Sequence, residues 1–333
     1  MVIPRLCVSI LLTLICFDCV HMLNRTPMDV GKQHAKELAF STHSRSLYVN
    51  CVSGLGNRLR AYASAAALAE TRNMALHVVW VRDHHFNANM DDLFDITLID
   101  VIDFDPIAML SPSKTIFYDD VIDARPNTVL DLSSDKDIYI RTPFSLSSET
   151  TVDYDLFAKH FKLLKPLPEI HKLVKRHVAM LPAPIESFIA VHIRHEDNFH
   201  VDVPQSEEPV LHDGERIISK YRNLCNEQSF VKAIQTRMRN NPGVHFLVAT
   251  DSPGLYSNLK ATASKNVHML DYSLSVYCRS KATRELQCLR FALVELMALS
   301  RCGKGLIWSH MSSYSDMLKV YFDETSRSNG CAH

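Results

Sequence analysis

Three short segments of this sequence combine residue types that can bind anionic groups. Residues 53–59 are SGLGNRL, residues 190–197 are AVHIRHED, and residues 248–252 are VATDS. A glycine turn offers backbone N–H groups, an arginine offers a planar guanidinium, and a threonine–aspartate pair offers hydrogen-bonding oxygens. Each segment includes or follows an apolar, β-leaning run. We therefore predict that all three lie at strand ends, where α/β proteins bind ligands.

The glycine turn lies between a β-leaning run at residues 47–52 and an alanine-rich stretch at residues 59–72, which we predict to be a helix. Gly54 and Gly56 permit a tight turn and let backbone N–H groups approach an anion, to which the helix N-terminus adds partial positive charge. Leu59 occupies the place of the third glycine of the dinucleotide-binding fingerprint. The turn alone therefore fits both an anion site and a plain strand–helix connector.

Arg194 and His192 lie at the end of a predicted strand over residues 188–193. They alternate with apolar Val191 and Ile193, so both side chains would face one side of the sheet. An arginine at this edge can bind a diphosphate through two parallel hydrogen bonds, and charge builds up on a diphosphate when it is a leaving group. The alternative is an ion pair of Arg194 with a carboxylate at the surface.

Thr250 and Asp251 follow a predicted strand over residues 244–249. The carboxylate of Asp251 could accept hydrogen bonds from the base or ribose of a nucleotide. Aspartate and serine also favour the N-cap of a helix, so Asp251 and Ser252 fit that role equally well. Both interpretations remain open at the level of sequence.

The composition limits the classes of partner. At 333 residues, 47% of them hydrophobic, the chain is long enough for two domains of ordinary size. The formal net charge of −1 gives no global electrostatic attraction to nucleic acid or to an acidic membrane surface. An anion site in this protein must therefore be local.

The first residues have the layout of a secretory signal. Arg5 precedes an almost wholly apolar run over residues 6–17, which Asp18 ends. The run is shorter than the roughly 20 residues that span a bilayer. We therefore predict a cleaved signal over residues 1–22, with a short uncleaved anchor as the alternative. Residues 23–45 are polar and are predicted to be a stem or linker.

An oxidising compartment would favour disulfide bonds. Six cysteines follow the signal, and this even number suits pairing without revealing the connectivity. They are Cys51, Cys225, Cys278, Cys288, Cys302 and Cys331. Asn24, Arg25 and Thr26 form an N-glycosylation sequon, which also suits a lumenal or secreted protein.

Strand and helix patterns alternate along the rest of the chain and indicate an α/β fold with parallel sheets. Proline pairs at residues 166–168 and 182–184 interrupt the alternation, and we place a domain boundary there, between residues 46–180 and 181–330. Two Rossmann-like domains that face a cleft are therefore expected. The predicted strands are residues 47–52, 75–81, 98–104, 137–140, 188–193, 244–249, 267–270 and 306–308. The predicted helices are residues 59–72, 154–164, 230–239 and 284–301.

The stretch over residues 54–94, GLGNRLRAYASAAALAETRNMALHVVWVRDHHFNANMDDLF, resembles the opening segment of the GDP-fucose-dependent fucosyltransferase superfamily. This superfamily includes α1,6-, nodulation, α1,2- and protein O-fucosyltransferases, and its signature is Gly-x-Gly-Asn followed by Arg or Gln. The sequence from His192 to Arg194 resembles its His-x-Arg motif, and Thr250-Asp251 resembles its Thr-Asp at a strand end. One departure is His195, where many α1,6 and α1,2 members have a second arginine.

The resemblance implies a GT-B-like fold and inverting transfer of fucose from GDP-fucose to a hydroxyl of a glycan or glycoprotein acceptor. Arg194 would bind the β-phosphate and be central to catalysis, while Asp197 or Asp202 would remove the acceptor proton. Residues 295–318 resemble the last nucleotide segment of the superfamily, where serines at a helix start donate to phosphate oxygens or cap the helix. The full set of expected donor-binding residues is Gly54, Gly56, Asn57, Arg58, His192, Arg194, His195, Thr250, Asp251, Ser312, Ser313 and Ser315.

A metal-dependent transferase is the competing enzyme class, because Asp-x-Asp triplets can hold a divalent cation against a diphosphate. Three such triplets begin at Asp103, Asp135 and Asp153. None follows the run of strands that such a fold requires, so we expect neither a metal nor a cofactor. The donor could also be a different nucleotide sugar, and the chain could be a catalytically silent protein of the same fold that binds a glycan or a protein. The expected compartment is the lumen of the endoplasmic reticulum or Golgi, or the exterior of the cell.

Overall fold

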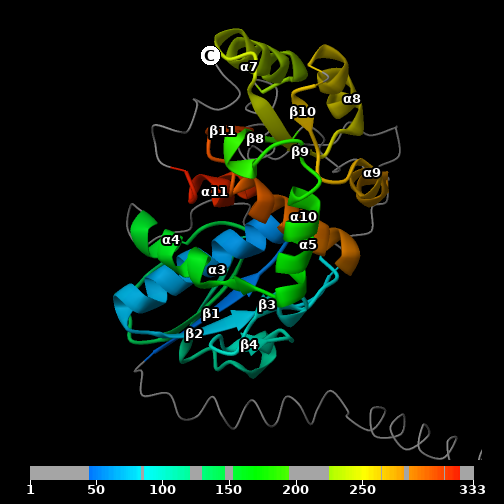
Figure 1. The fold of residues 1–333 in the computed structure, drawn as a ribbon. Coiled ribbons are helices and arrows are strands. Elements are labelled where there is room, and N and C mark those ends of the chain that lie inside the picture. Colours follow the sequence, from blue (N-terminus) through cyan, green and yellow to red (C-terminus); the bar gives the residue numbers. More distant parts are fainter. Residues whose placement is uncertain are drawn as a thin grey trace, which may run out of the picture. The chain divides into compact units, whose positions relative to one another are not determined.

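The computed structural model describes residues 45–83, 86–120, 130–146, 153–194, 225–263, 265–280, 285–310 and 312–322. Figure 1 shows the fold, whose framework is two parallel sheets of five and four strands. The predicted signal and nearly all of the predicted stem lie outside the described residues, as do His195, Asp197 and Asp202. Within the described ranges, no helix is both long and apolar enough to cross a membrane.

The first sheet has the strand order β4-β2-β1-β6-β5, and all of its strands are parallel. The strands are β1 (Ser46–Cys51), β2 (Ala75–Val79), β4 (Val101–Ile102), β5 (Thr115–Asp119) and β6 (Asp137–Thr142). Side chains alternate along β1. Leu47, Val49 and Cys51 join the apolar cluster that includes helix α3 (Leu55–Arg72), whereas Tyr48 belongs to a smaller cluster on the other face.

The second sheet has the order β10-β9-β8-β11 and is also parallel. Its strands are β8 (Phe188–Ile193), β9 (His245–Thr250), β10 (Val267–His268) and β11 (Leu306–Trp308). The helices of this part of the chain are α7 (Glu227–Asn240), α8 (Pro253–Thr262), α9 (Tyr272–Ser280), α10 (Leu286–Leu299) and α11 (Ser313–Lys319). Numbered along the chain, the strands have the 3-2-1-4 order found in Rossmann sheets. From the central strand β8 the chain therefore continues to β9 and β10 on one side, and then crosses to β11 on the other side of β8.

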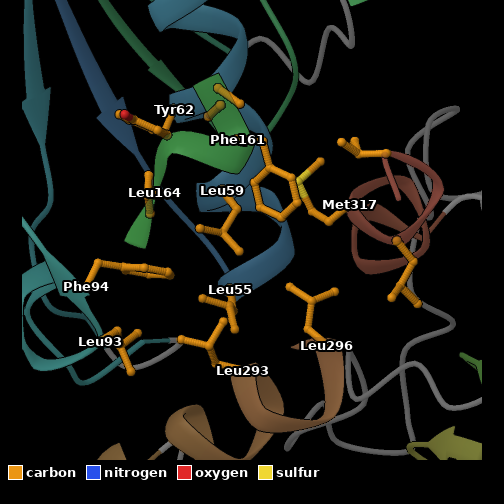
Figure 2. Packing of buried hydrophobic residues seen from close by; sticks show 14 of the residues in the cluster. Leu55, Leu59, Tyr62, Leu93, Phe94, Phe161, Leu164, Leu293, Leu296 and Met317 are labelled. Carbon is orange, nitrogen blue, oxygen red and sulfur yellow. The ribbon is translucent and has the colours of Figure 1, made fainter. Parts of the chain in front are cut away.

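Along the chain, the remaining elements lie either between strands of the first sheet or between the last strand of the first sheet and the first strand of the second. They are η2 (Met90–Asp92), β3 (Phe94–Asp95), η3 (Pro106–Met109), α4 (Tyr154–Leu163), β7 (Lys165–Pro166), α5 (Pro168–Val178) and η4 (Ile185–Ser187). One apolar cluster reaches from the first sheet to the second. Figure 2 shows Leu55 and Leu59 of α3 near Leu293 and Leu296 of α10, with Met317 of α11 beside them. The boundary between residues 180 and 181 stays a prediction.

Helix α3 begins at Leu55, four residues before the predicted start. Gly54 is its N-cap in an extended conformation (φ −74°, ψ 172°), so the second glycine of the turn already belongs to the helix. Ser53 has φ 70°, a left-handed conformation that costs a residue with a side chain about 1 kcal/mol or more. The helix ends at Arg72, and Asn73 caps it in the left-handed conformation with φ 51°.

Two predictions of secondary structure need correction. The proline pairs predict a break, yet α5 lies between them, because Pro168 is at the start of the helix, where a missing N–H costs nothing. The predicted strand over residues 98–104 is reduced to β4, and Leu98 is 94% exposed in the turn before it. Strand β5 has no counterpart in the sequence-based prediction.

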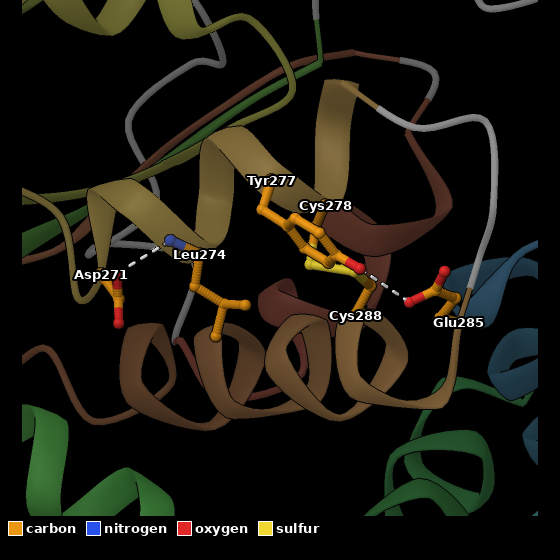
Figure 3. The surroundings of a disulfide bond; sticks show 6 residues. All are labelled: Asp271, Leu274, Tyr277, Cys278, Glu285 and Cys288. Carbon is orange, nitrogen blue, oxygen red and sulfur yellow. Dashed lines mark hydrogen bonds between the residues drawn. A yellow bond between two sulfur atoms is a disulfide. The ribbon is translucent and has the colours of Figure 1, made fainter.

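Figure 3 shows a disulfide bond between Cys278 and Cys288 that ties the end of α9 to the start of α10. The hydroxyl of Tyr277 donates to Glu285 Oε2 at 3.0 Å next to this bond. Cys225 is also disulfide-bonded. Cys51 and Cys302 are free, buried thiols, so the even number of cysteines does not mean that each of them is paired. Burial raises the pKa of Cys51 to about 12, which makes its thiol unreactive.

Removal of the Cys278–Cys288 bond by a Cys278→Ser/Cys288→Ser double substitution is expected to lower the free energy of unfolding. A sequence separation of 10 residues between the cysteines corresponds to a loss of about 2.5 kcal/mol, because the bond restricts the unfolded chain. Urea denaturation of the full chain measures this loss. Each single Ser variant should lose a similar amount, and a double variant as stable as the wild type would contradict the prediction.

Candidate functional site

The second sheet has its topological switch point between β8 and β11, where α/β folds form a ligand crevice at the carboxyl ends of the strands. Arg194 directly follows β8, and Ser309 directly follows β11. The backbone N–H of Arg194 donates to Ser309 Oγ at 2.8 Å, and the backbone N–H of Ser309 donates to the carbonyl oxygen of His192 at 3.0 Å. The backbone position of Arg194 is therefore fixed at the carboxyl edge of the sheet, at its switch point.

The side chain of Arg194 meets the third candidate segment. Strands β8 and β9 are neighbours in register, with Ile193 opposite Thr250, so the residues after them come together. Arg194 Nη1 lies 2.6 Å from Asp251 Oδ2, and the two side chains are 27% and 17% exposed. The ion pair considered for Arg194 is thus formed with Asp251 at the strand ends. Thr250 is buried, and its hydroxyl accepts from the N–H of Ser252 at 3.1 Å.

The helix-capping role considered for Asp251 belongs to its neighbour. Ser252 is the N-cap of α8, and its hydroxyl accepts from the N–H of Leu255 at 3.3 Å. The carboxylate of Asp251 faces Arg194 instead. The local sequence allowed either residue to cap the helix. Because Asp251 pairs with Arg194, which follows the neighbouring strand β8, Ser252 is the residue that caps α8.

The first sheet has its switch point between β1 and β6. The glycine turn follows β1, and the N–H of Val52 donates to the carbonyl oxygen of Thr142, at the end of β6, at 3.3 Å. Asn57 donates from Nδ2 to Ser53 Oγ at 2.9 Å and thereby stabilises the turn. Among the residues that the structure describes, no side chain caps the first turn of α3. The turn therefore lies at the switch point of the first sheet, where the same topological rule predicts a ligand.

The two switch points lie next to each other. A Cβ on Gly56 would be 2.7 Å from both Ser313 Oγ and the backbone nitrogen of Tyr314, so the starts of α3 and α11 are in close contact. One helical turn farther along, Arg60 Nη1 lies 3.6 Å from Asp316 Oδ2, and Arg60 Nε donates to the carbonyl oxygen of Pro143 at 2.9 Å. Burial lowers the pKa of Arg60, and Asp316 opposes this effect. Helix α11 thus contacts the glycine turn through Ser313 and the end of β8 through Ser315.

A Gly56→Ala substitution is expected to push α3 and α11 apart, because the new methyl group would overlap backbone atoms. Overpacking of this kind costs about 1–3 kcal/mol of unfolding free energy. Thermal and urea denaturation measure the cost. Gly254→Ala is the matched control, since nothing lies within 4 Å of a Cβ built on Gly254, which is in α8. An equally small effect of both substitutions would contradict the close contact.

His192 and the serines of α11 form internal contacts. His192 Nδ1 lies 2.8 Å from Ser315 Oγ, and its ring stacks on Tyr314 with centroids 4.5 Å apart. Ser312 is the N-cap of α11, and its hydroxyl accepts from the N–H of Ser315. Both Ser312 and Ser315 are buried, whereas Ser313 is only half-buried. Three serines were expected to donate to phosphate. Among them, only Ser313 has a partly exposed side chain, and this side chain lies beside Gly56.

Arg58 has a different environment from the one that a donor contact needs. Its side chain is fully buried and lies over the rings of Trp80 and Phe86, at 5.2 and 4.6 Å from their centroids. Arg58 Nε donates to the carbonyl oxygen of Ser53 at 2.9 Å, and Nη2 pairs with Asp83 at 2.9 Å. The structure therefore assigns this guanidinium to supporting the glycine turn from inside the core.

The Asp-x-Asp triplets have structural partners in the described part of the chain. Asp105 accepts from the hydroxyl of Tyr139 at 2.9 Å, and Asp153 caps α4 by accepting from the N–H of Leu156. Asp137 accepts from the N–H of Ser46 at 2.7 Å. Among the described residues, no group of three or more His, Cys, Asp or Glu side chains is placed to hold a metal ion.

A Ser–His–Asp chain lies at the opposite edge of the first sheet. His77 Nδ1 is 2.5 Å from Asp100 Oδ2, and His77 Nε2 is 3.3 Å from Ser46 Oγ. A nucleophilic serine also needs N–H donors for the developing oxyanion. The N–H of Ser46 itself donates to Asp137, and the strand amides beside it belong to the sheet. We therefore assign this chain to joining β1, β2 and the start of β4.

Ser309, Arg60 and Tyr314 help to build the site but are absent from the residues predicted from the sequence. Ser309 follows a three-residue apolar strand, and a polar residue in that place is the one local signal that could have indicated it. Arg60 and Tyr314 act through packing between parts of the chain that are more than 250 residues apart, for which the sequence has no local signal.

No protein-family model matches this chain, and no curated protein sequence matches it. Solved structures do. The fucosyltransferase NodZ from Bradyrhizobium is 14% identical with a TM-score of 0.50 and matches over 85% of this chain and 96% of its own. POFUT1 in complex with GDP-fucose is 12% identical with a TM-score of 0.51, over 85% and 95% of the two chains. A variant of Arabidopsis thaliana FUT1 in complex with GDP is 13% identical with a TM-score of 0.50, over 85% and 69%.

This chain has the fold of these fucosyltransferases. The predicted GT-B-like α/β architecture is therefore confirmed at the level of the fold. The sequence resemblance, which started from the glycine turn and the His-x-Arg motif, pointed to the same group of proteins. Since the identities are low, the roles of individual residues depend on the geometry described above.

Proposed function

We propose that this protein is an inverting glycosyltransferase that moves fucose from GDP-fucose to a hydroxyl of a glycan or glycoprotein. One observation carries the proposal: a partly exposed arginine, Arg194, is fixed through its backbone and its side chain at the switch point of a fucosyltransferase-like fold. Two proteins of similar fold are described with GDP-fucose, a NodZ α1,6-fucosyltransferase and POFUT1. An arginine at this place can bind the diphosphate of such a donor.

Transfer with inversion makes two chemical demands. The leaving diphosphate gains charge, which Arg194 would neutralise, assisted by the backbone N–H groups after Gly54 and by the hydroxyl of Ser313. The acceptor hydroxyl loses a proton, for which Asp197 and Asp202 remain the proposed bases. We propose that no metal takes part, because the guanidinium and the backbone N–H groups supply the positive potential.

The proposed compartment is the secretory pathway. The apolar run near the N-terminus and the sequon at Asn24 support it, and so does the disulfide between Cys278 and Cys288, because such bonds persist in oxidising compartments. The acceptor is proposed only as a glycan or glycoprotein. The contacts that would select it come from loops, which vary most between proteins of one fold.

The direct test is release of GDP from a panel of nucleotide sugars by the full chain, with and without EDTA. Turnover of GDP-fucose that EDTA does not change supports the proposal. Turnover of another nucleotide sugar would change the donor, and a requirement for added Mg²⁺ or Mn²⁺ would overturn the metal-independent mechanism. Binding of GDP without release from any donor, also in the presence of glycoprotein acceptors, would favour a catalytically silent binding protein.

A further inference from the structure

Asp251 differs from the other residues expected to bind the donor, because its carboxylate is paired with Arg194. Its carboxylate lies 2.6 Å from Arg194 Nη1 and is 17% exposed. The two residues follow neighbouring strands of one sheet, β8 and β9, so the pair does not depend on a long loop. On the other side, the backbone N–H of Arg194 is held by Ser309. Arg194 is thereby restrained at both ends, by a hydroxyl at its backbone and by a carboxylate at its guanidinium.

A guanidinium has two edges that can bind an oxyanion. Asp251 forms an ion pair with one terminal nitrogen, Nη1, and within the described residues the other nitrogens of this side chain form no hydrogen bond. The remaining edge can therefore face a diphosphate while the first stays on Asp251. Such a restraint removes rotamer freedom from Arg194 before the donor arrives, which is how pre-organised sites lower the barrier for charge that develops later.

The charge of Asp251 has the opposite effect on donor binding. A carboxylate beside the arginine places a negative charge near the diphosphate, where it repels the phosphate oxygens at the low dielectric of a half-buried site. A residue that served mainly to bind the nucleotide would increase affinity. From its position beside Arg194, Asp251 is expected to lower the affinity for an anion and to improve the orientation of the guanidinium that binds it.

We infer that Asp251 is the positioning residue of Arg194 and is not a ligand of the nucleotide base or ribose. This inference rests on the proposed function, and it assigns a role different from the nucleotide contact expected from the Thr-Asp motif. It predicts that affinity for GDP and the rate of donor turnover respond in opposite directions when the charge is removed.

The test compares the wild type with Asp251→Asn, Asp251→Glu and Asp271→Asn. Asp271 is the matched control, because it also follows a strand of the same sheet, but its carboxylate accepts from the N–H of Leu274 at the start of α9. For Asp251→Asn we expect a dissociation constant for GDP about threefold lower, and a kcat for GDP-fucose hydrolysis about 10–100-fold lower. Asp251→Glu should recover part of the kcat, and Asp271→Asn should change neither constant.

A higher KM and a weaker GDP affinity with unchanged kcat in Asp251→Asn would overturn the inference in favour of a nucleotide ligand. A second measurement needs no donor: the rate at which phenylglyoxal modifies Arg194, read by peptide mass spectrometry. It should rise in Asp251→Asn and stay unchanged in Asp271→Asn, and equal rates in all variants would overturn the pairing. If the wild type fails to turn over GDP-fucose but Arg194 responds as expected, the proposed function fails and the pairing stands.

Discussion

Replacement of Arg194 by alanine is expected to lower the release of GDP from GDP-fucose by about 10²–10³-fold. Removal of one pre-organised hydrogen-bond donor to a developing oxyanion has an effect of this size in other enzymes. Among the described residues, Arg194 is the positively charged side chain at the switch point of the second sheet. Its backbone N–H is bound by Ser309 and its guanidinium pairs with Asp251, so the charge is held in place. The loss should appear mainly in kcat.

Two further variants make this result interpretable. Arg194→Lys keeps the charge but loses the planar fork, so its activity should fall between those of Arg194→Ala and the wild type. Arg301→Ala removes an exposed arginine after the end of α10 and should leave the rate unchanged. If Arg194→Ala released GDP as fast as the wild type, the enzyme mechanism with Arg194 at its centre would be wrong.

The pairing of Arg194 with Asp251 illustrates what a sequence can predict. Both residues follow apolar runs that read as strands, and parallel strands bring their carboxyl ends to one edge of a sheet. Placement at strand ends was therefore enough to bring two candidate segments together. It was not enough to assign their roles, because the same spacing allows Asp251 to bind a nucleotide, cap a helix or pair with an arginine.

Contacts between distant elements could not be predicted in this way. Gly56 touches Ser313 and Tyr314 across more than 250 residues of chain, and that contact depends on how α3 and α11 pack. Nothing in the local pattern distinguishes a glycine needed for phosphate from one needed for helix packing. Similarly, helix α5 was not predicted because proline has two common roles. It interrupts helices and strands in many sequences, but it is also tolerated in the first turn of a helix, as Pro168 is here.

Arg58→Met is expected to destabilise the protein by about 2–4 kcal/mol and to leave the donor turnover of the folded fraction nearly unchanged. A methionine fills part of the space between Trp80 and Phe86, but it removes the ion pair with Asp83 and the hydrogen bond to the carbonyl oxygen of Ser53. Removal of one partner from a fully buried ion pair lowers the unfolding free energy by about 3–5 kcal/mol. The loss expected here is smaller, because the side chain of Asp83 is 32% exposed.

The measurement is urea denaturation together with GDP release at a temperature where the variant is still folded. Arg72→Met is the matched control, because Arg72 is an exposed arginine in the last turn of the same helix and its replacement should change the unfolding free energy by less than about 1 kcal/mol. A variant at Arg58 that keeps the stability of the wild type and loses donor turnover would support direct donor contact, as the motif alone suggests. The burial of the guanidinium predicts the reverse, since a side chain enclosed beneath the glycine turn acts on the donor only through the conformation of that turn.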